Sequence, residues 1–300
     1  MALVESSEKI LAKDVSQSEA ERIRGIFEKN GFKVAVESGT NHAEPKAATN
    51  ASTVKQTKKT STQLKQESQG LKYRVNADGK TCSVTGQGTC KDKDIVIPET
   101  IDGYKVTGII TETLYTSCFD EAIKSVNIPD SVTSIGNYAF HNCMSLASVI
   151  IPDSVTSIGT SAFWNCKSLA SVIIPDSVIG IGGYAFSGCT SLASVTIPDS
   201  VTSIGGFAFS SCTSLASVTI PDSVTSIGED AFWDCESLAN VTIPDSVTDI
   251  GTSAFKGCTS LASLRYNGTK KQWKKISLGF YWKQGSAILK VECTDGEIKI

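Results

Sequence analysis

The nine-residue phrase "IPDSVTSIG" occupies Ile128–Gly136 and returns every 23 residues along the chain, four times unchanged and twice as the near-copies "IPDSVIGIG" and "IPDSVTDIG". The six copies begin at Ile128, Ile151, Ile174, Ile197, Ile220 and Ile243. A fixed period of this length is typical of an array in which each unit buries its apolar face against its neighbours. The phrase therefore predicts a stack of coils.

The fullest unit, "SLASVTIPDSVTSIGGFAFSSCT" at Ser191–Thr213, predicts what one coil looks like. Alternating apolar residues indicate a short strand that Pro198 ends, because proline cannot donate to a β-ladder. "VTSIG" reads as a second short strand, in which Gly205 permits the next bend. "FAFSSC" reads as a tight helical turn. The residues expected in the core are Leu192, Val195, Ile197, Val201, Ile204, Ala208, Phe209 and Cys212.

These coils, stacked about 4.8 Å apart by parallel pairing, predict a β-rich, right-handed solenoid with short helical turns over roughly 94–268. The unit resembles the BspA-like leucine-rich repeat, a 23-residue class found in bacterial surface proteins and in some protozoa. The resemblance covers Leu71–Ile300, with a lead-in over "LKYRVNADGKTCSVTGQGTCKDKDIVIPETIDGYKVTGI" and a closing cap over "LRYNGTKKQWKKISLGFYWKQGSAILKVECTDG". It implies adhesion or binding of host or cell-surface proteins.

The chain divides into five segments by composition. Residues 1–37 read as a small strand–helix–strand unit, 38–70 as a disordered linker, 71–127 as the lead-in with degenerate first repeats, 128–268 as the repeats and 269–300 as the cap. "KILAKDVSQSEAERIRGIFEKNGFKVAVE" also resembles the last strand–helix–strand part of the ribosomal stalk protein's C-terminal domain. This first segment suggests an alternative function, an intracellular adaptor that is tethered through its N-terminal unit.

Composition limits the partners and the location of the protein. The 300 residues are 40% hydrophobic and 20% charged, with a net charge of −3 that gives no reason to expect nucleic acid as a partner. No apolar run is long enough to span a membrane. As written, the N-terminus lacks a secretory signal, which predicts a cytoplasmic protein, whereas the resemblance predicts a surface or secreted one. We expect a monomer that binds a protein partner.

Six of the ten cysteines recur once per coil, at Cys143, Cys166, Cys189, Cys212, Cys235 and Cys258. In-register side chains run side by side, which strains the dihedral angle that a disulfide needs, so a row of buried free thiols is expected. Cys82 and Cys90 differ, since they flank Gly86 symmetrically. They could face each other in a hairpin, either bonded or free.

The sequence offers little to catalysis. It holds two histidines, His42 and His141, and lacks a phosphate-binding glycine loop, a metal motif and a nucleophile with a repeating base. We therefore expect a non-catalytic scaffold without cofactor or metal.

Differences between coils are concentrated in the turn after "IG" and in the two residues after "AF". Large aromatic residues there suit protein recognition, in which Trp and Tyr are enriched. The expected binding edge comprises Tyr138, His141, Trp164, Lys167, Tyr184, Phe207, Trp233, Asp234 and Glu236. The alternative is that these rings merely cover the turn and shield its core. A second candidate surface is the row Ile150, Ile173, Thr196, Thr219, Thr242 and Arg265.

Overall fold

A computed structural model describes residues 8–15, 33–38, 52–57 and 66–300. The chain divides into two compact units, Met1–Lys65 and Gln66–Ile300. The division falls before the expected linker boundary at residue 70, because Ser68 already belongs to the second unit. Its main-chain N–H donates to the Val96 carbonyl, and its hydroxyl accepts from the Val96 N–H.

The first unit contains a three-stranded antiparallel sheet in the order β1-β3-β2, formed by β1 (Glu8–Val15), β3 (Ser52–Thr57) and β2 (Lys33–Ser38). Strand β2 lies where the sequence predicts the second strand of the strand–helix–strand unit. Strand β3 lies inside the segment expected to be a disordered linker, so that expectation is wrong for Ser52–Thr57. "STVKQT" is rich in β-branched residues, which favour strands. The helix expected within residues 1–37 lies outside the described residues.

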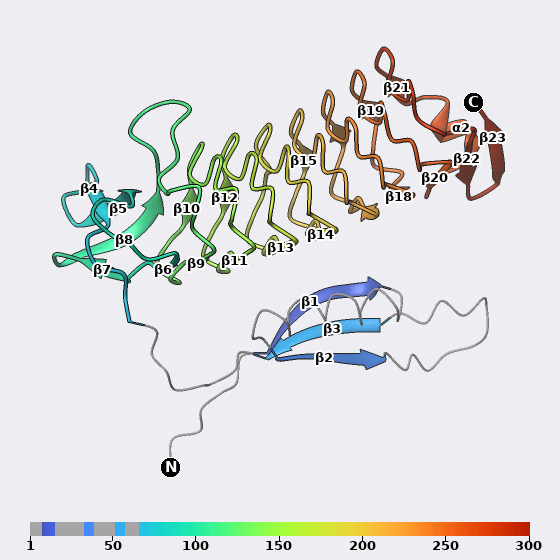
Figure 1. Cartoon of the computed structure of the whole chain (residues 1–300). Helices are drawn as coiled ribbons and strands as arrows, with labels where there is room; N and C mark the ends of the chain where they lie inside the picture. The colour runs from blue at the N-terminus through green and yellow to red at the C-terminus, as the bar shows by residue number, and fades with distance from the viewer. Residues whose placement is uncertain (1–7, 16–32, 39–51, 58–65) are drawn as a thin grey trace. The chain divides into compact units, whose positions relative to one another are not determined.

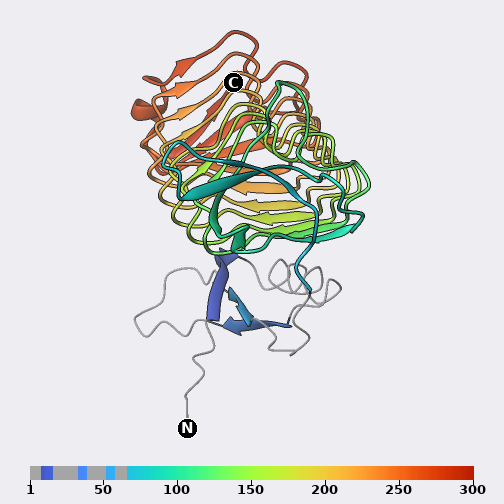
Figure 2. The same ribbon diagram turned by 90° about the vertical axis from the view of Figure 1, so that its left-hand side faces the viewer.

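The second unit is a β-solenoid of about nine turns, which confirms the predicted fold class. Figure 1 shows the coils side by side, and Figure 2 views the stack from its N-terminal end. One side is a ten-stranded sheet, parallel except for the terminal β23 (Gly296–Lys299). Its other strands are β6 (Asp94–Val96), β9 (Ser125–Asn127), β11 (Ser148–Ile150), β13 (Ser171–Ile173), β14 (Ser194–Thr196), β16 (Ser217–Thr219), β18 (Asn240–Ile243), β20 (Ser263–Tyr266) and β22 (Lys290–Cys293).

A second side carries the short strand of each "VTSIG" phrase, but its pairing is interrupted. The strands there are β8 (Tyr104–Ile109), β10 (Ser134–Ile135), β12 (Ser157–Ile158), β15 (Ser203–Ile204), β17 (Ser226–Ile227), β19 (Asp249–Ile250) and β21 (Ser277–Leu278). Between β12 and β15 only isolated bridges link Ile158 to Ile181 and Ile181 to Ile204. That coil reads "VIGIG", and Gly180 stands where four other copies have serine and the last has Asp249, which weakens its strand.

The core repeats the same side chains coil after coil. All six coil cysteines are fully buried and free. Five of them donate from Sγ to a phenylalanine carbonyl of the preceding coil at 3.1–3.2 Å, as Cys212 does to Phe186. The phenylalanine rings stack from Phe140 to Phe255 with centroids 5.1–5.5 Å apart. The predicted ladder of buried thiols is confirmed.

The turn after "IG" closes each coil without forming a continuous helix. Alternate N–H groups donate three residues back, as Ala208 does to Gly205, or to the next coil, as Phe209 does to Ala231. The turn therefore also hydrogen-bonds each coil to the next one. Among the described residues the single α-helix is α2 (Lys270–Trp273) in the cap, which Thr269 and Gln272 begin with a capping box. Trp273 and Ile276 are buried beneath it, as the sequence predicts.

The glycine of "IG" is required by close packing between coils. A Cβ atom on Gly205 would lie 2.7 Å from the Gly183 nitrogen and the Ile181 oxygen. We expected this glycine to permit a bend, but no left-handed φ is recorded for it. Only glycine lets the two backbones approach so closely.

The lead-in forms the N-terminal end of the solenoid. Strand β4 (Lys72–Val75) pairs antiparallel with β5 (Thr81–Gly86), which pairs parallel with β8. Because Gly86 ends β5, the hairpin that would have placed Cys82 opposite Cys90 does not form, and both thiols are free. Asp94 pairs with Ser125, 31 residues later, so this first coil carries eight residues more than the period of 23, as the spacing of Ile97 and Ile128 in the sequence predicts.

Candidate functional site

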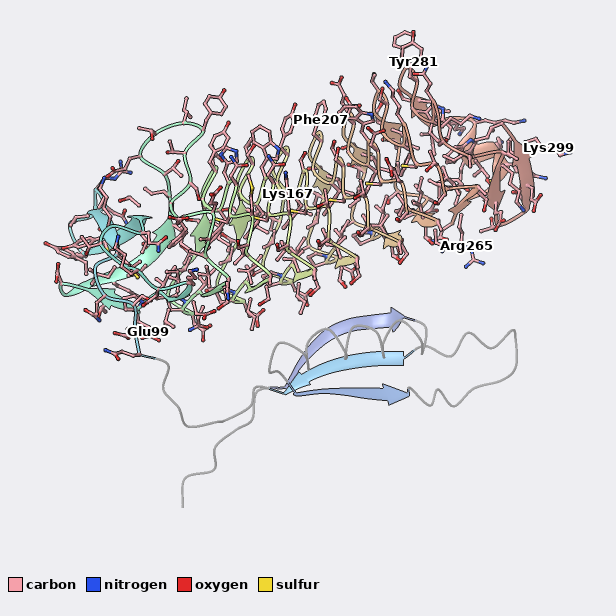
Figure 3. The ribbon with its side chains drawn as sticks, viewed as in Figure 1. Glu99, Lys167, Phe207, Arg265, Tyr281 and Lys299 are labelled. Carbon is pink, nitrogen blue, oxygen red and sulfur yellow. The ribbon has the colours of Figure 1, made fainter. Side chains whose placement is uncertain are left out.

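The expected binding edge is the turn side of the solenoid. Two positions per coil supply its large side chains, the second residue after the glycine of "IG" and the position three residues further on. Six rings from successive coils are linked by ring contacts, and we call this set the aromatic seam: Tyr115, Tyr138, His141, Trp164, Tyr184 and Phe207. In Figure 3, Phe207 and Tyr281 project from this edge and Arg265 from the opposite side.

Contacts within the seam are continuous over five coils. Tyr115 and Tyr138 have centroids 5.1 Å apart, and Tyr138 meets the edge of His141 at 5.8 Å. His141 stacks on Trp164 at 4.8 Å, and Trp164 lies 6.2 Å from Tyr184. Tyr184 then stacks on Phe207 at 4.5 Å with nearly parallel planes. Many ring faces are thus covered by neighbouring rings, which leaves edges and polar tips for a partner.

The seam tyrosines and Phe207 adopt an unusual backbone conformation. Tyr115, Tyr138, Tyr184 and Phe207 have φ values of 57–62°. Bulky residues rarely occupy this left-handed region, which suits glycine, asparagine and aspartate. The same position holds Ser161, Asp230 and Ser253 in other coils. Aromatic residues are therefore present here despite the local preference of the backbone.

The rings are not needed to close the core, which bears on the alternative that they merely cover the turn. The coils with Ser161 and Ser253 at this position bury Phe163 and Phe255 completely. Coils that carry tyrosine or phenylalanine there bury their core phenylalanine to the same extent. Shielding therefore does not explain why Tyr138, Tyr184 and Phe207 are aromatic.

Exposure varies among the predicted edge residues. Tyr184 is 38% exposed, and Tyr138, Trp164 and Phe207 are half-buried. Lys167 and Glu236 are exposed, whereas Trp233 and Asp234 are half-buried.

His141 differs from the expectation of a surface contact, because only 8% of it is exposed. It lies between Tyr138 and Trp164, and its Nδ1 is 3.2 Å from the Tyr115 carbonyl. Burial lowers its pKa, and the bond to the Tyr115 carbonyl opposes that shift.

Two members of the edge escape the sequence prediction. Tyr115, which is 67% exposed, lies in the inserted segment, where the repeat loses its phase. Its spacing of 23 residues before Tyr138 is the signal that could have found it. Tyr281 has a φ of 58° and is 65% exposed, so it occupies the equivalent position in the last coil.

One coil makes the edge acidic. Glu229, Asp230, Asp234 and Glu236 flank Trp233 in the sequence of the coil that follows Phe207. Burial and the neighbouring Glu229 raise the pKa of Asp230, while Lys256 opposes that shift. The Lys256 Nζ lies 6.0 Å from the centroid of the Trp233 ring. A lysine of the chain itself thus already lies beside this tryptophan and these carboxylates.

The second candidate surface is the outer face of the ten-stranded sheet. Ile150, Ile173 and Thr242 are half-buried there, and Thr196, Thr219 and Arg265 are exposed. Arg265 projects away from the edge that carries Phe207. This face brings no aromatic residues together and is separate from the seam.

Within residues 66–300 and the three described strands of the first unit, no group of three or more His, Cys, Asp or Glu could hold a metal ion. The same residues include no helix that is long and apolar enough to cross a membrane. The repeating serines Ser154, Ser177, Ser200, Ser223 and Ser246 each donate to a valine carbonyl of the preceding coil, as Ser200 does to Val178 at 2.5 Å. They hold the coils in register.

Comparison with known proteins gives a consistent result. Residues 109–197 and 180–280 match the BspA type leucine rich repeat region, in six copies. The crystal structure of a leucine-rich repeat protein from T. pallidum is 31% identical, covers 71% of this chain and 86% of its own, and superposes with a TM-score of 0.52.

A leucine-rich repeat protein from Bacteroides ovatus is 27% identical, covers 75% of this chain and 70% of its own, and gives a TM-score of 0.51. No curated protein matches the sequence. Two overlapping matches span more than half of the chain with the coil period seen in the structure, and the protein belongs to the BspA-type leucine-rich repeat family.

Proposed function

We propose that the protein is a non-catalytic recognition scaffold that binds a protein partner through the aromatic seam. The observation that carries this proposal is the continuous row of rings from Tyr115 to Phe207, four of them in a backbone conformation that disfavours aromatic residues. Strain that persists without a packing role is typical of functional positions. The fully buried core beneath Ser161 and Ser253 supports a role for the rings other than shielding.

Dimensions also favour a protein partner. Tyr115 and Phe207 are four coils apart, about 19 Å at the strand spacing. Tyr and Trp carry much of the binding energy at protein interfaces, because they bury a large area and retain a polar tip. We expect the protein to act as a monomer that presents one extended edge.

The biological setting of this recognition is adhesion, as resemblance to surface proteins of the family implies. An intracellular adaptor that uses the same edge is the alternative, with the first unit as its tether. Fractionation of cells, probed for residues 66–300, separates the two settings. Protein at the cell surface supports adhesion, and protein confined to the cytosol supports the adaptor.

The seam is tested by replacing its rings with the residues that other coils use. Trp164→Ser matches Ser187, and Tyr184→Ser matches Ser161. Partners captured by wild-type protein are identified by quantitative mass spectrometry, and the affinity of each is then measured directly. We expect the double variant to weaken binding at least tenfold, with the melting midpoint shifted by less than about 3 °C.

The matched control is Thr196→Ala with Thr219→Ala, two exposed positions on the sheet face. This control should leave affinity within about twofold. A partner that loses binding in the control and keeps it in the seam variant would move the site to the sheet face and refute the proposal.

A further inference from the structure

The charge of the array differs sharply between its coils and its cap. From residue 109 to 263 the basic residues are Lys124, Lys167 and Lys256, whereas acidic residues occur in almost every coil. After that point the cap is rich in lysine, including Lys270, Lys271, Lys274 and Lys275. A partner that approaches the coils therefore meets a negative field, which favours a cationic molecule.

Charge is also uneven along the binding edge itself. In the four coils from Tyr138 to Phe207 the edge offers aromatic and small polar side chains, with Lys167 as its charged residue. The next coil carries Glu229, Asp230 and Asp234 around Trp233. The edge thus changes from apolar to acidic within one coil spacing, about 4.8 Å.

One cation of the chain itself, the ammonium group of Lys256, already lies at the Trp233 ring. Lys256 places its ammonium group over the Trp233 ring, where the ring's negative face attracts a cation. One lysine faces several carboxylates, so negative charge remains in excess. The mutual repulsion of Glu229, Asp234 and Asp230 helps to raise the pKa of Asp230.

We infer that the partner presents an extended segment in which alternating apolar residues are followed by lysine or arginine, the apolar part lying on the aromatic seam and the cation beside Trp233, Asp230 and Asp234. This inference rests on the proposed function of the seam. From Tyr138 to Asp230 the edge spans four coil spacings, about 19 Å, which about six extended residues cover. Because neighbouring rings cover one another's faces, side chains that lie against ring edges suit the seam better than flat ligands that stack on open faces.

The probes are three fluorescent peptides that share a stretch of alternating leucine and serine. One ends in a run of lysines, one in glutamates and one in serines, and each is also made in reversed order because the segment could run in either direction. Binding is measured by fluorescence anisotropy at about 50 mM and about 150 mM salt. We expect the lysine peptide to bind at least tenfold tighter than the others, in one of the two orders and less tightly at the higher salt.

The charge is removed by Glu229→Gln, Asp230→Asn and Asp234→Asn together. Asp230 and Asp234 have φ values of 51° and 53°, which asparagine tolerates. The matched control removes the same charge from the aspartates that directly follow the proline of three coils, with Asp176→Asn, Asp199→Asn and Asp222→Asn, three exposed positions. The first variant should abolish the preference for lysine, and the control should keep it.

Each remaining outcome is decisive. If the glutamate peptide binds as tightly, if both triple variants lose the preference equally, or if none of the peptides binds better to wild type than to the Trp164→Ser, Tyr184→Ser variant, the inference is overturned. A captured protein partner that depends on Trp164 and Tyr184 but not on the acidic coil would overturn it too, while leaving the proposed function intact. If capture of every partner is insensitive to the seam rings, the proposed function itself fails.

Discussion

The interior and the edge of the solenoid are formed by neighbouring residues of the same turns, yet residue types repeat strictly in the interior and vary at the edge. Phe209 and Cys212 have the same counterpart in every coil from 128 to 268, whereas the Phe207 position on the edge holds tyrosine, serine, phenylalanine or aspartate. Interior residues repeat because each must fit the copy above and below it. Edge residues are not fixed by the core, because serine and aspartate occupy the same position in other coils, so their identity is free to serve a partner.

This comparison predicts that the largest loss of stability comes from substituting the glycine of "IG", where the backbones of two coils approach most closely. In Gly205→Ala the added Cβ would lie 2.7–2.8 Å from the backbone of the preceding coil, and neither backbone can yield without breaking the register. We expect a loss of about 3 kcal/mol or more in the free energy of unfolding, measured with denaturant.

Gly206→Ala is the control for this variant, because its Cβ would meet its nearest neighbour, the Glu229 carbonyl oxygen, at 3.3 Å. It should change stability by less than about 1 kcal/mol. Equal losses in the two variants would show that flexibility, and not the contact between coils, makes the first glycine necessary.

The thiol ladder should give the next largest effect. Cys212→Ala removes a fully buried sulfur and its bond to the Phe186 carbonyl, so we expect a loss of about 1–3 kcal/mol. The half-buried Cys293 provides the control, since Cys293→Ala leaves the ladder intact. If the two variants lose equal stability in denaturant melts, burial does not set the role of Cys212.

Reactivity gives a second measure of the ladder. Burial raises the pKa of Cys189 to about 12, so little thiolate exists near neutral pH. The six coil thiols should react slowly with a thiol reagent until denaturant is added. Rapid native labelling of all six would mean that the coils open readily.

Edge substitutions should change stability much less than binding. Tyr184→Asn relieves the left-handed strain of tyrosine, worth about 1–2 kcal/mol, but removes a stacked ring pair worth about 0.5–1.5 kcal/mol. The two terms nearly cancel, so we expect a change below about 1 kcal/mol together with weaker partner binding. A loss as large as that of Cys212→Ala would make Tyr184 part of the structural interior.

His141 should give the smallest effect, visible as a dependence on pH. Burial lowers its pKa, so the folded protein favours the neutral ring. The stabilisation is fully present above the ordinary value of 6.5 and is lost as the pH falls through the lowered value. Below pH 6.5 the wild type should lose more free energy of unfolding than His141→Ser, in which the residue matches Ser187. A wild type that gains stability relative to the variant in acid would contradict the assignment.

Periodicity predicted most of the interior because packing alone dictates it. Leu192, Phe209 and Cys212 are buried as expected, and the cap forms the helix that its lysine-rich segment predicts, with Trp273 buried. The hydrogen bonds that join the turns of successive coils were missed, because a short apolar run such as "FAF" suits a helical turn and a segment paired with the next coil equally well. Strand β3 was missed because Val54 and its neighbours lie in a polar stretch whose composition resembles a linker.

The sequence predicted which residues lie on the edge but not how their rings contact one another. Variation between coils identified Trp164, Tyr184 and Phe207, yet the contacts that join them depend on how each ring leans toward the next coil. His141 was expected at the surface because histidine is polar, and it is buried because two aromatic neighbours cover it. Tyr115 was not predicted, because it lies in the coil whose insertion interrupts the 23-residue period.

The interrupted pairing at Ile181 has a mechanical consequence. On the side of the short strands, an isolated bridge joins this coil to each neighbour, where other neighbouring coils share paired strands. Under tension along its axis the array behaves as springs in series, and the softest spring extends first. We therefore expect a pulled solenoid to separate first at one of the two junctions of the Ile181 coil, which lies between the coils of Trp164 and Phe207.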